Sequence, residues 1–307
     1  MDAVEDLIII GSGPAGYSAA MYAAREDFKP LLISGVPGGG QLMLTTLVEN
    51  YPGFPDGIMG PDLMDILRRH AEKFGARFID DNVTEVDFSN RPFTVKIGDK
   101  EYRANCVIVA PGASAKMLGI ESEQRFIGRG VSSCGTCDGP FYKNRKVIVV
   151  GGGDTAMEDS LFVAKFASSV TIVHRRDSFR ASKIMQEKVK SNPKIKIMFN
   201  TTVDEVLGSE KVTGVRLRNI DTNEVTEMAV DGVFVAIGHS PNTSFLDGKL
   251  KLDGQGYIIT RDEVKTDIDG VFVAGDVADR IYRQAVTAAA SGTKAALEAR
   301  HYLQNLK

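Results

Sequence analysis

The chain has 307 residues, of which 43% are hydrophobic and 25% charged, and this length suggests about two globular domains. Its net charge of -3 gives no electrostatic reason to expect a nucleic acid or an anionic membrane as a partner. No apolar run approaches the roughly 20 residues of a membrane-spanning helix, and the acidic first six residues do not resemble a leader peptide. Because only three cysteines occur, a secreted disulfide scaffold is excluded, and we expect a cytoplasmic protein.

The first chemical motif is a glycine-rich loop between a strand and a helix. An apolar run at residues 7–10 leads into Gly11-Ser12-Gly13-Pro14-Ala15-Gly16, followed by a helical stretch at 17–25 and a second apolar run at 30–33. Glycines at such a turn allow backbone amides to approach a pyrophosphate, whose charge the helix N-terminus favours. The pattern predicts a dinucleotide-binding unit, although glycine-rich turns can also be purely structural.

The same pattern occurs a second time. Residues 146–150 form a β-branched run that leads into Gly151-Gly152-Gly153-Asp154-Thr155-Ala156, then a helix to about residue 166 and a strand at 170–173. A strand–loop–helix–strand unit that recurs about one domain length later indicates two nucleotide-binding halves. The predicted fold class is therefore α/β, with two Rossmann-like dinucleotide-binding domains.

The remaining elements suggest how the two domains are connected. Three apolar runs end in a glycine turn, at 107–112, 233–238 and 271–276, and such runs suit strands of parallel sheets that are covered on both faces. We also expect strands within 85–103 and 202–228, an amphipathic helix at 61–74 with Leu63, Ile66 and Leu67 on one side, and a terminal helix at 284–302. The predicted domains are 1–112 with 244–307, and an inserted domain at 113–243.

The residues after the second unit's last strand indicate which nucleotide binds there. Val173 is followed by His174-Arg175-Arg176, with Arg180 four residues further on. An acidic residue that holds a ribose 2′-OH is usual about 20 residues after the glycine loop. Guanidinium groups there suit a 2′-phosphate instead, so we expect NADPH in preference to NADH. A solvated basic turn is the simpler alternative. In the first unit the second strand ends in Ser34-Gly35 without an acidic residue for the ribose. By spacing alone, this weakens the prediction of a dinucleotide site there.

Cys134 and Cys137 form a Cys-x-x-Cys pair next to Asp138. A zinc site needs about four ligands, the third cysteine (Cys106) lies in an apolar strand, and the four histidines form no spaced pair, so we expect no metal. A cysteine pair of this kind beside a βαβ unit indicates a redox dithiol, and Asp138 could move its proton. A hydride donor and a disulfide require an intermediary that accepts a hydride and delivers electrons to sulfur, as a flavin does.

These motifs together resemble the low-molecular-weight, flavin-dependent thioredoxin reductases of the pyridine nucleotide-disulfide oxidoreductase superfamily over essentially the whole chain. Cys134–Gly139 is similar to the family's redox segment Cys-Ala-Thr-Cys-Asp-Gly, with Gly135 in place of alanine. Residues 174–181 are similar to its NADPH 2′-phosphate segment. Its members also tend to lack the acidic ribose residue of the first unit. The FAD-binding residues that we expect from the first loop and from the resemblance are Gly11, Ser12, Gly13, Pro14, Ala15, Gly16, Ser34, Gly40, Gln41, Asn50, Gly112, Asp276, Arg283, Gln284 and Ala285.

The resemblance also implies roles and partners. Cys137 would face the flavin, Cys134 would exchange with the disulfide of thioredoxin or a thioredoxin-like protein, and Asp138 would protonate the departing thiolate. The expected NADPH-binding residues are Gly151, Gly153, Asp154, Thr155, His174, Arg175, Arg176 and Arg180. The family is usually homodimeric, and its cysteine pair exchanges places with the nicotinamide by domain rotation, which puts hinges near 112–115 and 239–243.

One departure concerns the partner protein. The family commonly has two aromatic residues after Asp-Gly, where this chain has Pro140 before Phe141-Tyr142, whereas Arg129 matches a position linked to docking. A related flavoprotein that reduces a glutaredoxin-like carrier or a small disulfide is therefore an alternative. A non-catalytic nucleotide sensor with the cysteine pair as a redox switch is a second alternative.

Overall fold

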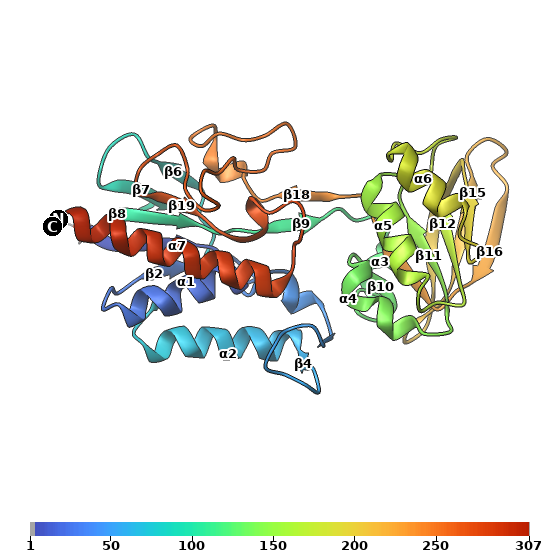
Figure 1. Ribbon diagram of the computed structural model, residues 1–307, viewed down its shortest axis with the longest axis horizontal. Coiled ribbons are helices and arrows are strands. Elements are labelled where there is room, and N and C mark those ends of the chain that lie inside the picture. The colour runs from blue at the N-terminus through green and yellow to red at the C-terminus, as the bar shows by residue number, and fades with distance from the viewer. Residues whose placement is uncertain (1–3, 307) are drawn as a thin grey trace. The chain divides into compact units, whose positions relative to one another are not determined.

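The computed structural model describes residues 4–306, which form two compact units (Figure 1). The first unit contains the chain up to Ser114 and again from Ser240, and the second contains Ala115–His239. The chain leaves the first unit in β9 (Ala113–Ala115) and returns in β18 (His239–Pro241), and these two short strands pair with each other. Each unit is built around its own sheet and is described separately.

The first unit contains a seven-stranded sheet with strand order β5-β2-β1-β8-β7-β6, in which β19 also pairs with β8. Its parallel part places β1 between β2 and β8, while β6 and β7 are antiparallel. The helices α1, α2 and α7 pack beside one another (Figure 1). The bounds are β1 (Val4–Ile10), α1 (Pro14–Arg25), β2 (Leu31–Ile33), α2 (Gly60–Lys73), β5 (Arg77–Ile79), β6 (Glu85–Asp87), β7 (Phe93–Ile97), β8 (Lys100–Val109), β19 (Val271–Val273) and α7 (Ala285–Leu306), with the short pair β3 (Leu47–Val48) and β4 (Ile58–Met59) outside the sheet.

Both faces of this sheet are buried, as the continuous apolar runs predict. Leu7 and Ile9 of β1 point into a core with the alanines of α1 and α7, whereas Ile8 and Ile10 point into a second core on the opposite face. This alternation follows from the two-residue period of a strand. Of the three apolar residues predicted on one side of α2, Leu63 is buried and Leu67 packs against the core, whereas Ile66 is 36% exposed.

The close packing of α1 against α7 fixes the loop that precedes α1. A Cβ atom at Gly292 of α7 would lie 2.0 Å from the carbonyl oxygen of Ala15, so only glycine permits this approach. Ala15 also contacts Gly275, which follows β19. The start of α1, the end of β19 and the first half of α7 are therefore held together in one small region.

The second unit repeats this arrangement with a five-stranded parallel sheet of order β10-β17-β11-β12-β13. The helices α5 and α6 contribute to a core on one face, and an antiparallel sheet of order β14-β15-β16 contributes to a core on the other. The bounds are α3 (Glu121–Arg125), β10 (Val131–Ser132), α4 (Gly135–Asp138), β11 (Lys146–Val150), α5 (Asp154–Val163), β12 (Ser169–Val173), α6 (Lys183–Lys190), β13 (Ile195–Met198), β14 (Thr201–Gly208), β15 (Val212–Asn219), β16 (Val225–Ala229) and β17 (Gly232–Val235).

The strand–loop–helix pattern predicted at residues 146–173 is present, with one difference in length. Helix α5 ends at Val163, not near residue 166. The amides of Lys165 and Phe166 donate to carbonyls three residues earlier, at 3.1 and 3.0 Å, so the chain continues as tight turns. The terminal helix α7 is longer than expected and reaches Leu306.

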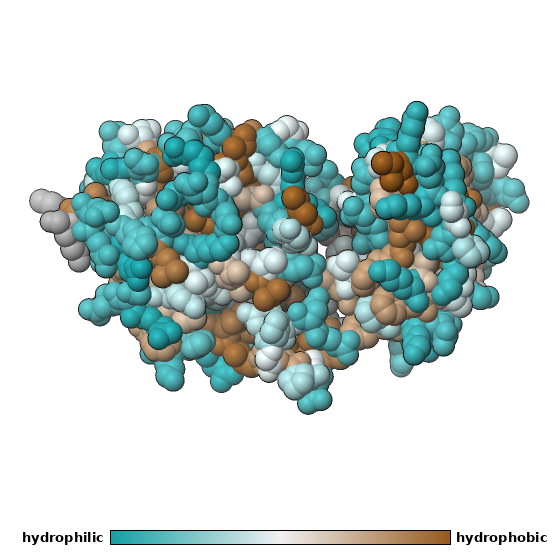
Figure 2. Space-filling view, viewed as in Figure 1, coloured by the Kyte–Doolittle hydropathy of each residue, from teal (hydrophilic) through white to brown (hydrophobic). Residues whose placement is uncertain are grey.

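The surface is mostly hydrophilic on the face drawn in Figure 2, where brown apolar residues are scattered among teal ones. This matches the four hydrophobic cores, two in each unit, that take up most of the large apolar side chains. Within residues 4–306, no helix has the length and apolar character needed to cross a membrane.

Candidate active site

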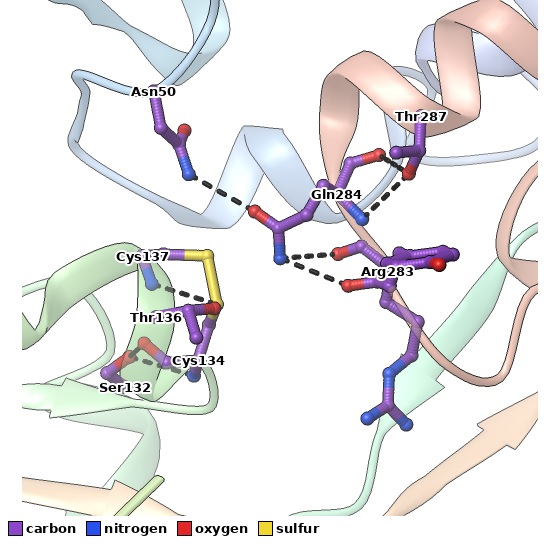
Figure 3. The surroundings of a disulfide bond; sticks show 9 residues. Asn50, Ser132, Cys134, Thr136, Cys137, Arg283, Gln284 and Thr287 are labelled. Atoms are coloured by element: carbon purple, nitrogen blue, oxygen red, sulfur yellow. Dashed lines mark hydrogen bonds between the residues drawn. A yellow bond between two sulfur atoms is a disulfide. The ribbon is translucent and has the colours of Figure 1, made fainter. Parts of the chain in front are cut away.

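The structure contains a disulfide between Cys134 and Cys137 (Figure 3). Cys134 lies directly before the one-turn helix α4, and Cys137 lies within it, so their Cα atoms are 5.3 Å apart. The third cysteine, Cys106, is fully buried in β8, as predicted. In the described part of the chain, no group of three His, Cys, Asp or Glu side chains is placed to hold a metal ion.

Polar hydrogens surround the sulfur of Cys134. The amide of Cys137 donates to Cys134 Sγ at 3.2 Å, and the Thr136 hydroxyl lies 3.4 Å from the same sulfur (Figure 3). The Cys134 amide in turn donates to the Ser132 hydroxyl at 3.0 Å. Donors aimed at a sulfur favour its negative form, so this geometry favours a thiolate at Cys134 once the disulfide is reduced.

Asp138 ends α4 and lies beside the disulfide in the sequence. Burial raises the pKa of its carboxyl group, and a hydrogen bond with Ser132 opposes this shift. The pKa of Tyr142 is raised to about 12 by burial and by the negative charges of Asp138 and Asp231. A carboxyl group that keeps its proton to a higher pH than usual is suited to donate a proton to a thiolate.

The first glycine-rich loop connects β1 to α1, with Pro14 at the first position of the helix. Gly11 has φ +105°, and a Cβ atom there would lie 2.2 Å from the carbonyl oxygen of Ala110 at the end of β8. At Gly13, by contrast, a Cβ atom would meet nothing within 4 Å. The loop is therefore tightly packed on its protein side and open at its middle glycine, as a phosphate-binding turn requires.

Ser12 connects this loop to the ends of neighbouring segments. Its hydroxyl donates to the Ser34 carbonyl at 2.6 Å and accepts from the Gly39 amide at 2.7 Å. Gly40 follows at the start of the 3-10 turn η1 (Gly40–Leu44), and a Cβ atom there would lie 3.3 Å from Gly13 Cα. Four of the predicted residues, Ser12, Gly13, Ser34 and Gly40, therefore lie at one edge of the first unit's sheet.

Asp276 provides the clearest sign that a polar group binds in the first unit. It lies in the turn η4 (Gly275–Val277) after β19, and its Oδ1 atom is buried with no hydrogen-bond partner among the described residues. Burial raises the pKa of this carboxyl group to about 7, assisted by Asp279 and opposed by Arg283. A buried acceptor without a donor is costly. A hydroxyl-rich ligand such as the ribityl chain of a flavin would supply that donor.

The remaining predicted residues of the first unit lie at the start of α7 and nearby. Gln284 donates to the carbonyls of Tyr282 and Arg283 at 3.1 and 3.2 Å, and it accepts from Asn50 at 3.2 Å (Figure 3). Arg283 has φ +48°, and Ala285 begins α7. Gln41 is exposed in η1. Gly112 follows β8, where its carbonyl accepts from the Asn242 amide at 3.0 Å.

The second glycine-rich loop has the same geometry as the first. A Cβ atom at Gly151 would lie 2.4 Å from the carbonyl oxygen of Ala236 at the end of β17, whereas at Gly153 it would meet nothing within 4 Å. Asp154 begins α5, but its carboxylate accepts from the amide and the hydroxyl of Ser182, both at 2.9 Å. Asp154 therefore connects the start of α5 to Ser182, which follows the basic residues. Thr155, the next predicted residue, is half-buried in α5.

The basic segment after β12 divides into a buried residue and three exposed ones. The His174 ring is 6% exposed, lies 5.6 Å from the Phe179 ring, and makes a 3.1 Å contact between Nε2 and the Ser178 carbonyl. Burial lowers the pKa of His174, which favours the neutral ring. Arg175, Arg176 and Arg180 are exposed, and no ion pair within residues 4–306 involves them.

Sequence inspection missed several residues that the structure places at the site. Ser132 bonds to the Cys134 backbone, Ser182 bonds to Asp154, and Asp159 of α5 lies against Gly135. For Asp159 a signal was available, because glycine stands where the redox segment of the family has alanine. The contacts of the two serines have no comparable signal, because serine is common in loops.

Comparisons with known proteins agree with this geometry. The family model of pyridine nucleotide-disulphide oxidoreductases matches residues 5–292. The chain is 52% identical to a thioredoxin reductase of Rickettsia felis over 97% of both chains, and 51% identical to one of Streptomyces coelicolor over 100% of this chain and 96% of the relative. The crystal structure of thioredoxin reductase from Streptococcus pyogenes is 39% identical and superimposes with a TM-score of 0.95, covering 99% of this chain and all of the other.

Family membership accounts for the three features described above: two dinucleotide loops of matching geometry, an unsatisfied buried acceptor, and a cysteine pair with an adjacent proton donor. The family uses a flavin and a nicotinamide nucleotide, and the buried acceptor of Asp276 and the open middle glycines suit such ligands. The chain therefore belongs to the pyridine nucleotide-disulphide oxidoreductase family and is a flavin-dependent disulfide reductase of the thioredoxin reductase type.

Proposed function

We propose that this protein uses NADPH and FAD to reduce the disulfide of thioredoxin or a closely similar carrier protein. The observation that carries the proposal is the Cys134–Cys137 disulfide in a chain with two dinucleotide loops. Hydrogen-bond donors point at Cys134 Sγ, and the pKa of the neighbouring Asp138 carboxyl group is raised. The names of the most similar relatives support thioredoxin as the partner.

FAD binds in the domain made of residues 1–112 and 244–307. The loop residues Gly11–Gly16 with Ser34 would hold the adenosine and pyrophosphate end. Gly40 and Gln41 would lie on the flavin side, and Asp276 would accept from the ribityl hydroxyls. The residues assigned to the isoalloxazine end of the flavin are Asn50, Gly112, Arg283, Gln284 and Ala285. When bound, a flavin supplies two-electron chemistry that connects a nicotinamide to a disulfide. The buried Oδ1 atom of Asp276, which has no hydrogen-bond donor among the described residues, supports this assignment most directly.

NADPH binds in the domain made of residues 113–243. Gly151, Gly153 and Thr155 form the pyrophosphate turn at the start of α5. Arg175, Arg176 and Arg180 hold the 2′-phosphate, and their exposure and lack of carboxylate partners in the described structure support this role. His174 and Asp154 are also assigned to the NADPH site: the buried ring of His174 packs under Gly152, and the carboxylate of Asp154 accepts from the Ser182 amide, so both fix the shape of this segment.

The two crossings between the domains, at 112–115 and 239–243, act as hinges. Glycine stands beside each crossing: Gly112 has φ +72° and Gly238 has φ +104°, and a Cβ atom at either would meet nothing within 4 Å. Backbone torsions can change at such positions without side-chain clashes.

The cysteine pair reduces the partner by two exchange steps. Reduction of the Cys134–Cys137 disulfide takes up two electrons and two protons and gives two thiols. The Cys134 thiolate attacks one sulfur of the partner disulfide, which forms a mixed disulfide and releases a partner thiolate that takes a proton from Asp138. Cys137 then attacks Cys134 Sγ, which restores the protein disulfide and releases the second partner thiol.

The partner docks beside α4, where Phe141 is 43% exposed and Pro140 precedes it. An exposed aromatic ring next to a redox pair is suited to an apolar patch on a carrier protein. Arg129, also exposed in this unit, adds a positive charge to the docking surface. A carrier other than thioredoxin is the second candidate, because proline replaces one of the two aromatic residues common in the family.

We also propose a homodimer in the cytoplasm. A compartment in which thiols stay reduced suits the free Cys106 and a protein that keeps a carrier in its dithiol form. Sedimentation velocity at micromolar concentration should give twice the monomer mass. Cell fractionation with a periplasmic and a membrane marker should place the protein with cytoplasmic enzymes.

The deciding experiment follows NADPH oxidation with thioredoxin, a glutaredoxin-like protein and a small aromatic disulfide as acceptors. The parent should reduce thioredoxin far faster than the other two, and Cys134→Ser and Cys137→Ser should each abolish it while NADPH still bleaches the bound flavin. Equal rates with all three acceptors would contradict the choice of thioredoxin. Full activity of either serine variant would contradict the exchange steps.

A further inference from the structure

Gly135 leaves a space next to the redox pair that a carboxylate occupies. A Cβ atom at Gly135 would lie 2.5 Å from Asp159 Oδ1, 2.7 Å from Asp159 Cγ and 2.8 Å from Asp159 Cβ. Alanine at position 135 is therefore incompatible with the present position of Asp159. The glycine and the carboxylate form a matched pair.

Asp159 reaches this position from α5, the helix that begins at the second glycine-rich loop. Its side chain is 8% exposed, whereas its neighbour Glu158 on the same helix is exposed. Gly135 follows Cys134 directly and begins α4. The carboxylate of Asp159 thus lies against the backbone of the turn that carries both sulfur atoms.

We propose that Asp159 is a positioning residue for the redox pair: its carboxylate occupies the space left by glycine at position 135 and opposes the formation of a thiolate at Cys134. The proposal rests on the redox role of the cysteine pair and is independent of which carrier protein is reduced.

The physical basis is the balance of charges around Cys134 Sγ. The Cys137 amide and the Thr136 hydroxyl are directed at this sulfur and favour its negative form. The buried carboxylate of Asp159, which lies against the adjacent residue Gly135, disfavours it, because like charges repel more strongly where water is excluded. Asp159 therefore makes the Cys134 thiol less acidic than the two donors alone would make it.

Other titratable groups lie on α4, on the turn after it and on α5, the elements around the redox pair. Asp138 lies on α4 itself, and Tyr142 lies on the following turn η2 (Gly139–Tyr142), with its pKa raised in part by Asp138. On α5, Asp154 and Glu158 are exposed. A test must therefore distinguish the effect of Asp159 on thiolate formation at Cys134 from the effect of Asp138 and from that of any other charge on α5.

The first experiment measures the pH dependence of alkylation at Cys134 in the flavin-loaded Cys137→Ser protein. Iodoacetamide reacts with the thiolate, and buried Cys106 is protected. We expect Asp159→Asn to lower the midpoint by about one pH unit, which below the midpoint is about a tenfold faster reaction. Glu158→Gln removes the same charge from an exposed site and should leave the midpoint unchanged. An unchanged midpoint in Asp159→Asn would overturn the proposal.

The second experiment tests the matched pair by a double-mutant cycle in the same background. Gly135→Ala should displace the carboxylate and lower the midpoint in the direction of Asp159→Asn. In Asp159→Ala, where the space is free, Gly135→Ala should have no further effect. Equal effects in the two backgrounds would overturn the steric link. Neither measurement uses NADPH or a carrier protein, so failure here leaves the proposed function untouched, and loss of turnover leaves this proposal untouched.

Discussion

The His174 ring lies directly beneath Gly152: a Cβ atom at Gly152 would be 2.2 Å from Cε1 and 2.4 Å from Nδ1 of that ring. The carbonyl of Gly152 also accepts the amide of Arg180 at 2.8 Å. The glycine-rich loop and the basic segment are therefore in contact through one buried ring and one hydrogen bond. This contact holds the residues proposed for the pyrophosphate and for the 2′-phosphate in a fixed spatial relation.

We predict that Gly152→Ala weakens both folding and NADPH binding. The added methyl group must displace the His174 ring from a packed position, and overpacking of this kind costs about 1–3 kcal/mol. Thermal unfolding and NADPH titration should both change. Gly153→Ala is the matched control: its Cβ atom meets no protein atom within 4 Å, so it should bind NADPH more weakly at an unchanged melting temperature. An unchanged melting temperature in Gly152→Ala would show that the ring moves freely.

We predict that replacing both Arg175 and Arg176 by alanine removes the preference for NADPH. Both side chains are exposed, so their loss should leave the fold intact and remove charge-assisted bonds to a 2′-phosphate. The kcat/KM for NADPH should fall by about 10- to 100-fold, while the value for NADH stays within about twofold. Lys196→Ala, an exposed cation on β13, controls for net charge. An equal fall with both nucleotides would place the arginines outside the 2′-phosphate site.

We predict that Asp138→Asn slows exchange with the carrier protein and changes its pH dependence. Burial raises the pKa of this carboxyl group, so the acid form persists to a higher pH and is lost as the pH rises through the raised value. Removing the donor should cost about 100-fold or more in the rate of dithiol oxidation by thioredoxin. The decline of that rate on the alkaline side, which the parent should show, should be absent from the variant. Stopped-flow mixing of pre-reduced protein with thioredoxin measures both, and a parent-like profile would assign the proton to another group.

The sequence predicted the local features well because each depends on neighbouring residues. The loop after residue 10, the loop after residue 150 and the Cys134–Cys137 pair are all recognisable from spacing. The contacts that shape the site connect distant positions and could not be predicted in this way. Examples are His174 beneath Gly152 and Asp159 against Gly135, where one side chain fills the space that a glycine leaves. His174 was predicted to bind NADPH, and that role stays a prediction; its packing under Gly152 is a contact that the sequence did not indicate.

The last prediction concerns Asp276 and the pH dependence of stability in flavin-free protein. The pKa of this carboxyl group is raised to about 7 in the folded state, against roughly 3.9 when unfolded. The folded state therefore binds more protons between these values, so its stability is greatest at low pH and declines as the pH rises toward 7. Asp276→Asn cannot ionise and should lack this decline. The difference in melting temperature between variant and parent should therefore grow between pH 4 and 7 and then level off.

The same variant separates the folding role of Asp276 from its proposed binding role. An amide at position 276 can still accept a hydrogen bond, but it loses the stronger charge-assisted bond to a hydroxyl donor. Asp276→Asn should therefore bind FAD more weakly, by about 10-fold, although its flavin-free form is more stable at pH 7. Flavin fluorescence titration of the flavin-free protein gives the affinity. Asp279→Asn, which removes a nearby charge and also alters the turn that Asp279 caps, should destabilise the flavin-free protein. If Asp276→Asn bound FAD as tightly as the parent, the buried acceptor at Asp276 would not be a group that holds the ligand.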